Sequence, residues 1–409
     1  MKWVNFLHIY QPPGQRRDIV EKVTRESYQP LLAFLKKNPR VSITFNISGS
    51  LTEQLLQYGY KDVIADLKLL AERGQVELVG SAKYHIILPL LPEETQHQIE
   101  LNNIVNSSAF GDAFHPQGFF PPEMCYSEKM ERQVFEAGYT WILLDGISYD
   151  GHLGSVRFDK KYQSPSGLTV VFRNRILSNF LSFTASADNP DDFWSAINKD
   201  ERSQEYLITA MDGENLGHHR PELLGLWQKL VTDSRVETMT ISAYMSSLSN
   251  IVKCRPVPSS WSSQEHEIEQ GIPYGLWQYP DNEIHTMQWR LVIMIIAEVN
   301  RAKKKKLSAY KEVRGRLDAA LSSDQFWWAS AAPWWDVGMV SEGAKRLADV
   351  IFPLPSKDSV QTQAIQLAKD IHTTAKKWHE TGIAKKRQDR FAKISELRPY
   401  IGGDKVINT

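Results

Sequence analysis

Residues 2–13, KWVNFLHIYQPP, give the first indication of the fold. The apolar run Lys2–Ile9 predicts a buried strand, and Pro12-Pro13 stops it, because proline cannot donate to the hydrogen-bond ladder of a sheet. His8 and Gln11 therefore lie at or just beyond the carboxyl end of this strand. Polar side chains in that position indicate a loop that carries chemistry on a rigid scaffold.

Short apolar strands followed by amphipathic helices continue to roughly residue 250. This alternation favours a parallel α/β architecture. A doubly wound open sheet would alternate in the same way, but no strand is followed by a glycine-rich phosphate loop. We therefore expect a parallel barrel with its chemistry at one mouth. Further strands are expected at Val41–Ile47, Val76–Gly80, Gly118–Phe120, Trp141–Leu144 and Tyr206–Met211, with His85, Glu123, Asp145 and Asp212 after strands.

The pattern changes after residue 255. Pro256, Pro258 and the run Ser259–Ser263 predict a linker or surface loop. Helical patterns then dominate, over His285–Lys305, Ala309–Leu321, Gly343–Ile351 and Ser359–Thr381. We expect a barrel domain over residues 1–255 and a helical C-terminal region over residues 256–409.

The charge balance excludes several classes of protein. Lys and Arg total 48, as do Asp and Glu, so a strongly basic nucleic-acid surface is not expected. A hydrophobic fraction of 42% argues against disorder, and two cysteines cannot form a disulfide framework.

The N-terminus lacks the apolar run of a signal peptide, and Leu291–Val299 is too short to span a membrane. We expect a cytoplasmic protein without nucleic-acid or membrane partners.

The aromatic residues allow two interpretations. The chain has 12 Trp, and many of them, including Trp261, Trp277 and Trp328, fall in its last third. A helical core rich in large side chains explains most single tryptophans. A carbohydrate cleft also explains them, because the C–H faces of sugars stack on aromatic rings.

One acidic residue follows the short strand in GFFPPEMCY, residues 118–126. Two prolines fix the backbone before Glu123 and provide a rigid mount for its carboxylate. An arbitrary Glu in a loop is normally an exposed surface residue. The apolar surroundings of Glu123, including Phe120 and Met124, favour a functional group.

A second acidic segment is MDGENLGHH, residues 211–219. Asp212 lies where the preceding strand ends, and Glu214 and His218 are near enough to orient it or to bind substrate. The glycines allow the backbone to approach a ligand closely. A metal site is the alternative interpretation, but the spacing does not match a helix-borne motif such as H-E-x-x-H.

Two carboxylates on separate strand-end loops are the arrangement that glycoside hydrolysis requires. One attacks the anomeric carbon or activates water, and the other protonates the leaving oxygen. His8, Gln11, Glu77 and His85 lie on or after other strands. A sugar needs such donors and acceptors for its hydroxyl groups.

These segments together resemble glycoside hydrolase family 57, whose members are retaining enzymes active on α-glucans. The resemblance is carried by HIYQPP, GQVELVGSAKYHIILPLLP, GFFPPEMCYS and MDGENLGHH, in that order. WQYPDNEIHTMQW and QFWWASAAPWW resemble the aromatic-rich fifth region more loosely. Asn179, in place of an acidic residue, and the segment Ser330-Ala-Ala-Pro333 depart from the family pattern.

The resemblance implies a (β/α)7 barrel followed by a helical region, without metal or organic cofactor. It implies double displacement, with Glu123 as nucleophile and Asp212 as general acid/base. The substrate is then an α-glucan or maltooligosaccharide, processed by hydrolysis or by transfer. The implied substrate-binding residues are His8, Gln11, Glu77, His85, Arg175, Glu214, His218, Trp277 and Trp328.

Two other hypotheses remain open on the sequence. The first is a metal-dependent carbohydrate deacetylase on a similar barrel, with Asp145 or Asp212 and histidines such as His8 and His218 around a divalent ion. The second is a non-catalytic glycan-binding protein that keeps the barrel. The sequence gives neither the linkage cleaved nor the oligomeric state.

Overall fold

A computed structural model describes residues 1–186, 188–355 and 358–394 of the chain. The end of the predicted C-terminal region, residues 395–409, lies outside the described residues. The chain forms two compact units, of which the first is Met1–Ile268 and the second begins at Glu269. The predicted boundary at residue 255 precedes this division, because the segment after it packs on the first unit.

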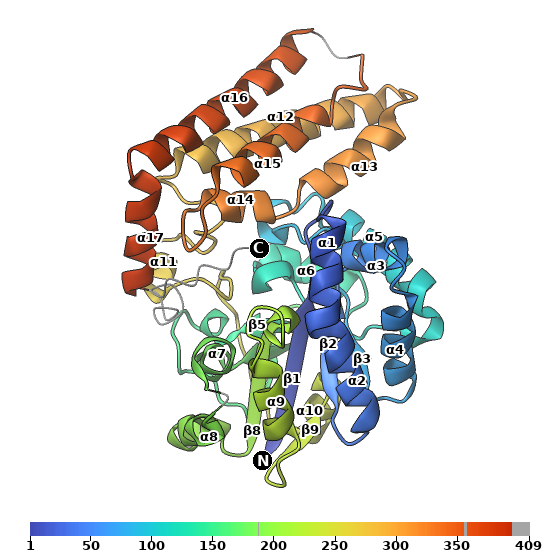
Figure 1. The fold of residues 1–409 in the computed structure, drawn as a ribbon, viewed down its shortest axis with the longest axis vertical. Coiled ribbons are helices and arrows are strands. Elements are labelled where there is room, and N and C mark those ends of the chain that lie inside the picture. The colour runs from blue at the N-terminus through green and yellow to red at the C-terminus, as the bar shows by residue number, and fades with distance from the viewer. Residues whose placement is uncertain (187, 356–357, 395–409) are drawn as a thin grey trace. The chain divides into compact units, whose positions relative to one another are not determined.

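Two parallel sheets build the core of the first unit (Figure 1). One has the order β3-β2-β1-β8, and the other contains β7-β5-β4. The pairs among these seven strands are parallel. The strands are β1 (Lys2–Ile9), β2 (Ile43–Ile47), β3 (Val76–Leu78), β4 (Gly118–Phe119), β5 (Trp141–Asp145), β7 (Thr169–Arg173) and β8 (Tyr206–Asp212).

Backbone hydrogen bonds join the two sheets at both edges. Gly80 N–H donates to Gly118 O at 2.9 Å, and Phe120 N–H donates to Gly80 O at 2.9 Å. On the other side, Asn174 N–H donates to Ile208 O at 2.8 Å. The ring β1-β2-β3-β4-β5-β7-β8 is therefore closed, which confirms the predicted (β/α)7-type barrel. β7 was not among the predicted strands.

The buried strands explain the apolar runs in the sequence. β1 is central, and Trp3, Val4, Phe6, Leu7 and Ile9 are all buried. Its buried Asn5 contacts α9, because the indole N–H of Trp227 donates to Asn5 Oδ1 at 3.0 Å. The helices of this unit are α1 (Arg17–Val23), α2 (Gln29–Lys37), α3 (Gly49–Gln57), α4 (Lys61–Glu72), α5 (Thr95–Phe110), α6 (Glu128–Glu136), α7 (Arg175–Asn179), α8 (Pro190–Lys199), α9 (Leu223–Val231) and α10 (Ile241–Ser247).

Three shorter strands extend the sheets. β9 (Glu237–Met239) pairs with the first residues of β1. β6 (Lys161–Gln163) runs antiparallel to β7, and β10 (Ile251–Lys253) pairs with β6. These strands enlarge the sheets but do not belong to the ring.

The second unit is helical, as predicted for the C-terminal region. Its longest helices are α12 (Glu283–Lys304) and α16 (Asp358–Glu380), and α12, α15 and α16 pack on one another. α12 buries Ile284, Leu291, Val292 and Ile295 along one face. The remaining helices are α13 (Tyr310–Ala320), α14 (Asp324–Ala329), α15 (Val337–Asp349) and α17 (Ile383–Ile394), and α11 (Glu265–Glu269) ends at the division between the units.

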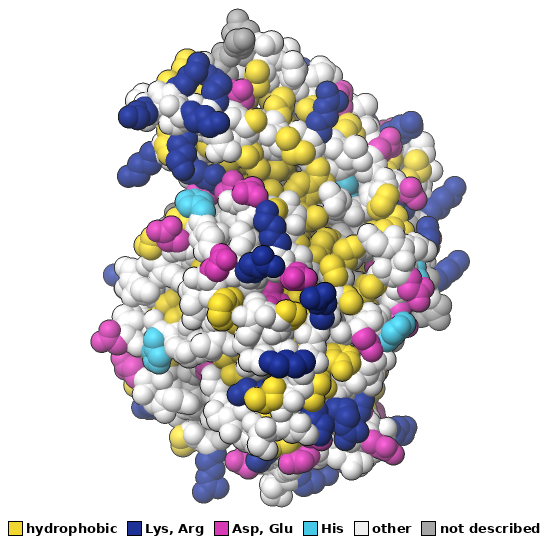
Figure 2. Space-filling view, turned by 180° about the vertical axis from the view of Figure 1, so that it is seen from behind, with side chains coloured by type: hydrophobic (Ala, Val, Ile, Leu, Met, Phe, Trp, Pro, Cys, Tyr) yellow, Lys and Arg dark blue, Asp and Glu magenta, His cyan; other side chains and the backbone are white. Residues whose placement is uncertain are grey.

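The surface mixes the two signs of charge. On the face in Figure 2, Lys and Arg side chains lie among Asp and Glu over much of the area, as the equal totals of 48 suggest. Among the described residues, no helix is both long and apolar enough to span a membrane.

Candidate active site

The pairing register brings three polar side chains to one level at the carboxyl edge of the barrel. His8 on β1 is paired with Asn46 on β2 and with Asp212 on β8. Carboxyl ends of parallel strands share one edge, so this level is the mouth where barrel chemistry is found. The sequence placed His8 and Asp212 at strand ends, and the register puts them side by side.

Glu123 is mounted on a constrained turn beyond β4. It has φ 59° and ψ 17°, and Met124 has φ 48°, so two consecutive non-glycine residues adopt the left-handed region. Met124 and Cys125 are buried and hold the turn in place. The Glu123 side chain is 20% exposed to solvent, so the carboxylate is accessible to a ligand.

Trp261 binds Glu123 through both backbone and side chain. Its backbone N–H donates to Glu123 O at 3.0 Å, and its indole N–H donates to Oε2 at 2.5 Å. A donor aimed at the carboxylate favours the ionised form and fixes its orientation. The prediction of a linker or surface loop over Ser259–Ser263 was wrong here, because Ser259, Ser260 and Ser263 are buried.

A buried ion cluster holds this tryptophan segment. Asp145 at the end of β5 accepts from Arg173 Nε at 2.6 Å and from Arg175 Nε at 2.8 Å. Arg175 also donates to Ser263 O at 2.6 Å and to Ser260 O at 3.0 Å. All three groups are almost fully buried, with side chains exposed by 5% or less. The guanidinium of Arg175, predicted to bind substrate, thus supports the loop that carries Trp261.

Arg173 connects the cluster to both acidic residues. Its guanidinium lies 5.2 Å from the centre of the Trp261 ring and donates to Trp261 O at 3.3 Å. Its positive charge also acts on Asp212 and opposes part of the effect of burial there. Burial is the larger effect and raises the pKa of Asp212 to about 6.

Glu214 lies behind Asp212 and is firmly held. Its Oε1 accepts from the backbone N–H of Tyr10 at 3.0 Å and from the hydroxyl of Tyr28 at 2.5 Å. Burial and the neighbouring Asp212 raise the pKa of Glu214 to about 8. A pKa above 7 favours the protonated form of Glu214 at neutral pH. Gln11 also hydrogen-bonds Tyr28, so this predicted residue joins the same group.

A chain of two histidines leads from β2 to Glu123. With Asn46 Oδ1 accepting at 2.7 Å, His8 carries its proton on Nδ1. His8 Nε2 lies 3.1 Å from His85 Nε2, so the two rings are within hydrogen-bonding distance of each other. Burial lowers the pKa of His8 to about 4 and that of His85 well below its usual value, so both rings are neutral.

His85 lies beside the carboxylate of Glu123. His85 Nδ1 lies 3.8 Å from Oε1, the oxygen that Trp261 does not bind. The His85 ring stacks on Tyr10 at 4.3 Å, and His85 itself has φ 54°. A residue held in this unfavourable backbone region indicates that the surrounding packing fixes the ring.

Other predicted substrate-binding residues are not brought into this group. Glu77 is paired with Thr44, two residues before Asn46, so it lies deeper in the barrel. Its carboxylate accepts from Thr44 and from the backbone and side chain of Ser242 at the start of α10. His218 is close in sequence to Glu214, but its Nδ1 pairs with Glu26 at 2.6 Å.

The two predicted tryptophans belong to the second unit. Trp277 is fully buried, and its carbonyl accepts from the indole N–H of Trp289 at 2.9 Å. A ring without exposed surface has no face free for a sugar. Trp328 lies on α14 and is partly exposed.

Sequence reasoning missed Asn46, Tyr28 and Arg173, and it placed Trp261 in a linker. Asn46 is a polar residue near the end of a mostly apolar strand, a signal like that of His8 on β1. Tyr28 and Arg173 reach the site only through contacts between distant segments. The sequence carries no local sign of them.

Within the described part of the chain, the histidines and acidic residues do not assemble a metal cluster. Among the described residues, no group of three or more His, Cys, Asp or Glu has the arrangement of a metal site. Asp145 forms ion pairs with two arginines, and His218 pairs with Glu26. The ligand set considered for a deacetylase is therefore not gathered at one point.

Comparison with known proteins agrees with this geometry. The sequence model of glycosyl hydrolase family 57 matches residues 5–256. The chain belongs to this family. It is 31% identical over 151 residues to alpha-amylase 1 of Dictyoglomus thermophilum, covering 37% of this chain and 21% of the relative. It is 26% identical over 266 residues to an alpha-amylase of Pyrococcus horikoshii, covering 60% of this chain and 41% of the relative.

A solved structure shares the fold of this chain. The crystal structure of 4-alpha-glucanotransferase from Thermococcus litoralis aligns with TM-score 0.67 at 16% identity, over 87% of this chain and 60% of that chain. At this identity the likeness concerns the fold alone. The chain spans less than half the length of the two amylases described above.

Proposed function

We propose that this chain is a retaining glycosidase or glucanotransferase acting on α-linked glucans, with Glu123 as nucleophile and Asp212 as general acid/base. The observation that carries the proposal is the pair of carboxylates on strand-end loops of a family 57 barrel, in opposite electrostatic settings. Glu123 faces a hydrogen-bond donor that favours its ionised form. Asp212 has a raised pKa of about 6 and so is partly protonated near neutral pH.

The first step follows from these roles. One oxygen of Glu123 attacks the anomeric carbon of the bound sugar, and the bond from that carbon to the glycosidic oxygen breaks. Asp212 gives its proton to the departing oxygen. A covalent glycosyl ester on Glu123 results, with Asp212 ionised.

The second step restores both residues. Asp212 removes a proton from water or from a sugar hydroxyl, whose oxygen attacks the anomeric carbon. The ester bond to Glu123 breaks, and the configuration at the anomeric carbon is retained. Water yields hydrolysis and a glucan hydroxyl yields transfer, so one intermediate serves both reactions.

The neighbouring groups support these roles without taking part in bond exchange. Trp261 holds Oε2 of Glu123, which leaves Oε1 as the attacking oxygen. Neutral His8 and His85 do not neutralise the carboxylate by ion pairing. Protonated Glu214 does not repel the charge that Asp212 acquires in the first step.

The test is turnover of maltoheptaose by the purified full chain, with product lengths and anomeric configuration followed over time. We expect retained α-configuration and loss of at least 1,000-fold in kcat for Glu123→Gln, on the order of what removing a covalent catalyst costs. Unchanged turnover by Glu123→Gln would overturn the assignment. Products longer than the substrate would indicate transfer, and shorter products alone would indicate hydrolysis.

A further inference from the structure

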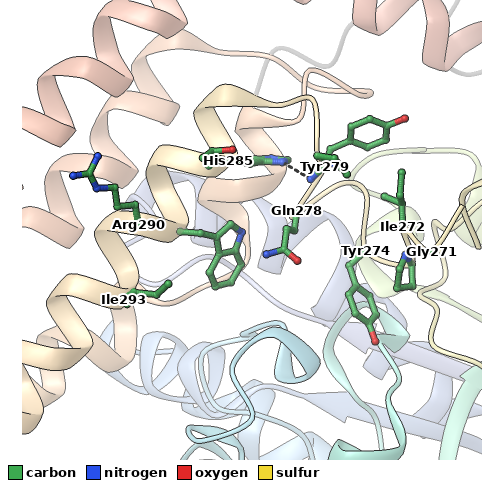
Figure 3. Close-up of a pocket in the computed structure, with 12 residues that line it drawn as sticks. Gly271, Ile272, Tyr274, Gln278, Tyr279, His285, Arg290 and Ile293 are labelled. Atoms are coloured by element: carbon green, nitrogen blue, oxygen red, sulfur yellow. Dashed lines mark hydrogen bonds between the residues drawn. The ribbon is translucent and has the colours of Figure 1, made fainter.

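The second unit contains a cavity whose chemistry is unlike that of the carboxylate site. It has a volume of about 550 Å³ and lies between the loop of residues 271–280 and the first part of α12 (Figure 3). This volume is within the roughly 300–1,000 Å³ of small-molecule sites. All the residues that line it belong to the second unit.

The walls of the cavity are mostly apolar and aromatic. Tyr274 and Trp289 line it, each with 9% of its surface exposed, together with Ile272 and Ile293. Ile293 is 68% exposed and lies at the rim of the cavity. Such walls suit a ligand that presents C–H faces.

The aromatic wall is fixed before any ligand binds. One face of Trp289 stacks on Phe326 at 4.4 Å, and its indole N–H donates to Trp277 O. His285 accepts from the backbone N–H of Tyr279 at 3.1 Å, the dashed contact in Figure 3, and donates to Phe326 O at 2.8 Å. The loop and α12 are thereby held together, which lowers the ordering cost of binding.

One polar group is available inside this frame. The Gln278 side chain points into the space between the loop and α12 (Figure 3). It is exposed, and its amide makes no hydrogen bond to any other residue that the structure describes. An amide offers both donors and an acceptor, as a pair of sugar hydroxyls requires.

The lining of the cavity carries few formal charges. No carboxylate or ammonium group lines the cavity among the described residues. Arg290 is a charged residue of the lining, and its guanidinium points away from the cavity in Figure 3. We infer that this cavity is a binding site for a short, uncharged segment of α-glucan, stacked on Trp289 and Tyr274 and hydrogen-bonded by Gln278. The substrate class rests on the function proposed above, whereas the site itself rests on the lining residues.

The experiment locates maltoheptaose on the full chain by amide hydrogen exchange, so that each region is read separately. We expect protection of peptides covering residues 271–282 as well as those covering 118–126. We test two variants at exposed positions, Gln278→Ala and Ile293→Asp. Each should raise about tenfold the maltoheptaose concentration that gives half-maximal protection of the 271–282 peptides, because a hydrogen bond or an apolar contact is lost. The same variants should leave the 118–126 response unchanged.

Gln366→Ala is the matched control, because Gln366 is an exposed glutamine on α16 bonded only to Asp370 among the described residues. It should alter neither response. Absence of protection at 271–282, or protection that both variants leave unchanged, would overturn the inference. The inference would also be overturned if the free protein self-associated and Ile293→Asp abolished that association, because a second copy would then cover the cavity. Protection at 271–282 in a protein that does not turn over maltoheptaose would refute the proposed function but not the inferred binding site.

Discussion

Trp261 donates its indole N–H to Oε2 of Glu123 at 2.5 Å, although the two residues are 138 positions apart in the chain. The contact joins the loop after β4 to a segment that the sequence presents as a linker. It leaves Oε1 as the oxygen that faces His85. The orientation of the proposed nucleophile therefore depends on a residue outside the strand-end loops.

Replacement of Trp261 by Phe tests this dependence. Phe keeps the ring but removes the donor, and a hydrogen bond to a charged group is worth about 1.5–3 kcal/mol. We expect kcat/KM on maltoheptaose to fall roughly 10- to 100-fold, with the unfolding transition little changed.

Trp194→Phe is a suitable comparison, because Trp194 is a mostly buried tryptophan on α8 of the same unit that packs against Phe193 and Arg235. Its activity should match that of the wild type. Equal activity of Trp261→Phe and the wild type would contradict the positioning role.

The Asp145 cluster should be a stability element. Asp145→Asn would leave two buried guanidinium groups without their counter-ion, and breaking a buried pair in this way costs about 3–5 kcal/mol. We expect urea unfolding to show a loss of this order. The exposed pair of Asp233 and Arg235 provides the comparison, and Asp233→Asn should shift the transition little. Similar shifts for the two variants would contradict this account.

Glu214 should make stability depend on pH. Its pKa is about 8 in the folded chain against an ordinary value of 4.5, so the folded state holds a proton that the unfolded state releases. The contribution of Glu214 to stability is therefore lost as pH rises from about 5 to 8, by up to about 1.4 kcal/mol per pH unit from this one group. Glu214→Gln cannot titrate, so its unfolding free energy should decline less over this range. Parallel curves for variant and wild type would rule out a buried protonated Glu214.

Asp212 should control the alkaline limb of activity. A general acid must be protonated in the first step, and the pKa of Asp212 is about 6. We expect kcat/KM to fall tenfold per pH unit above about pH 6. Glu214→Gln should keep this limb, and Asp212→Asn should abolish it along with most activity. A limb that survives in Asp212→Asn would assign the acid to another residue.

Local pattern predicted six of the seven strands of the ring, but it did not predict the site. The predicted strand Lys2–Ile9 coincides with β1, and predicted strand ends place His8, Glu123 and Asp212 correctly at the mouth. Glu77 illustrates the limit. Its position relative to the mouth depends on its pairing with Thr44, which no single strand reveals.

Long-range packing accounts for the rest. Ser259–Ser263 has the composition of a surface loop, yet it is buried because Arg175 donates to its carbonyls. Arg173 and Arg175 in turn depend on β7, a strand of five residues that was not predicted. Residues that hold the proposed nucleophile are thus recognisable only after the barrel is closed.

The central claim is that Glu123 becomes covalently attached to the sugar. The most direct measurement is mass spectrometry of peptides from the full chain after reaction with a 5-fluoro-α-glucosyl fluoride, which slows breakdown of the intermediate. The account predicts a glycosyl adduct on the peptide covering residues 118–126, on Glu123, and none in Glu123→Gln. An adduct on another carboxylate, or turnover with inversion and without any adduct, would contradict it.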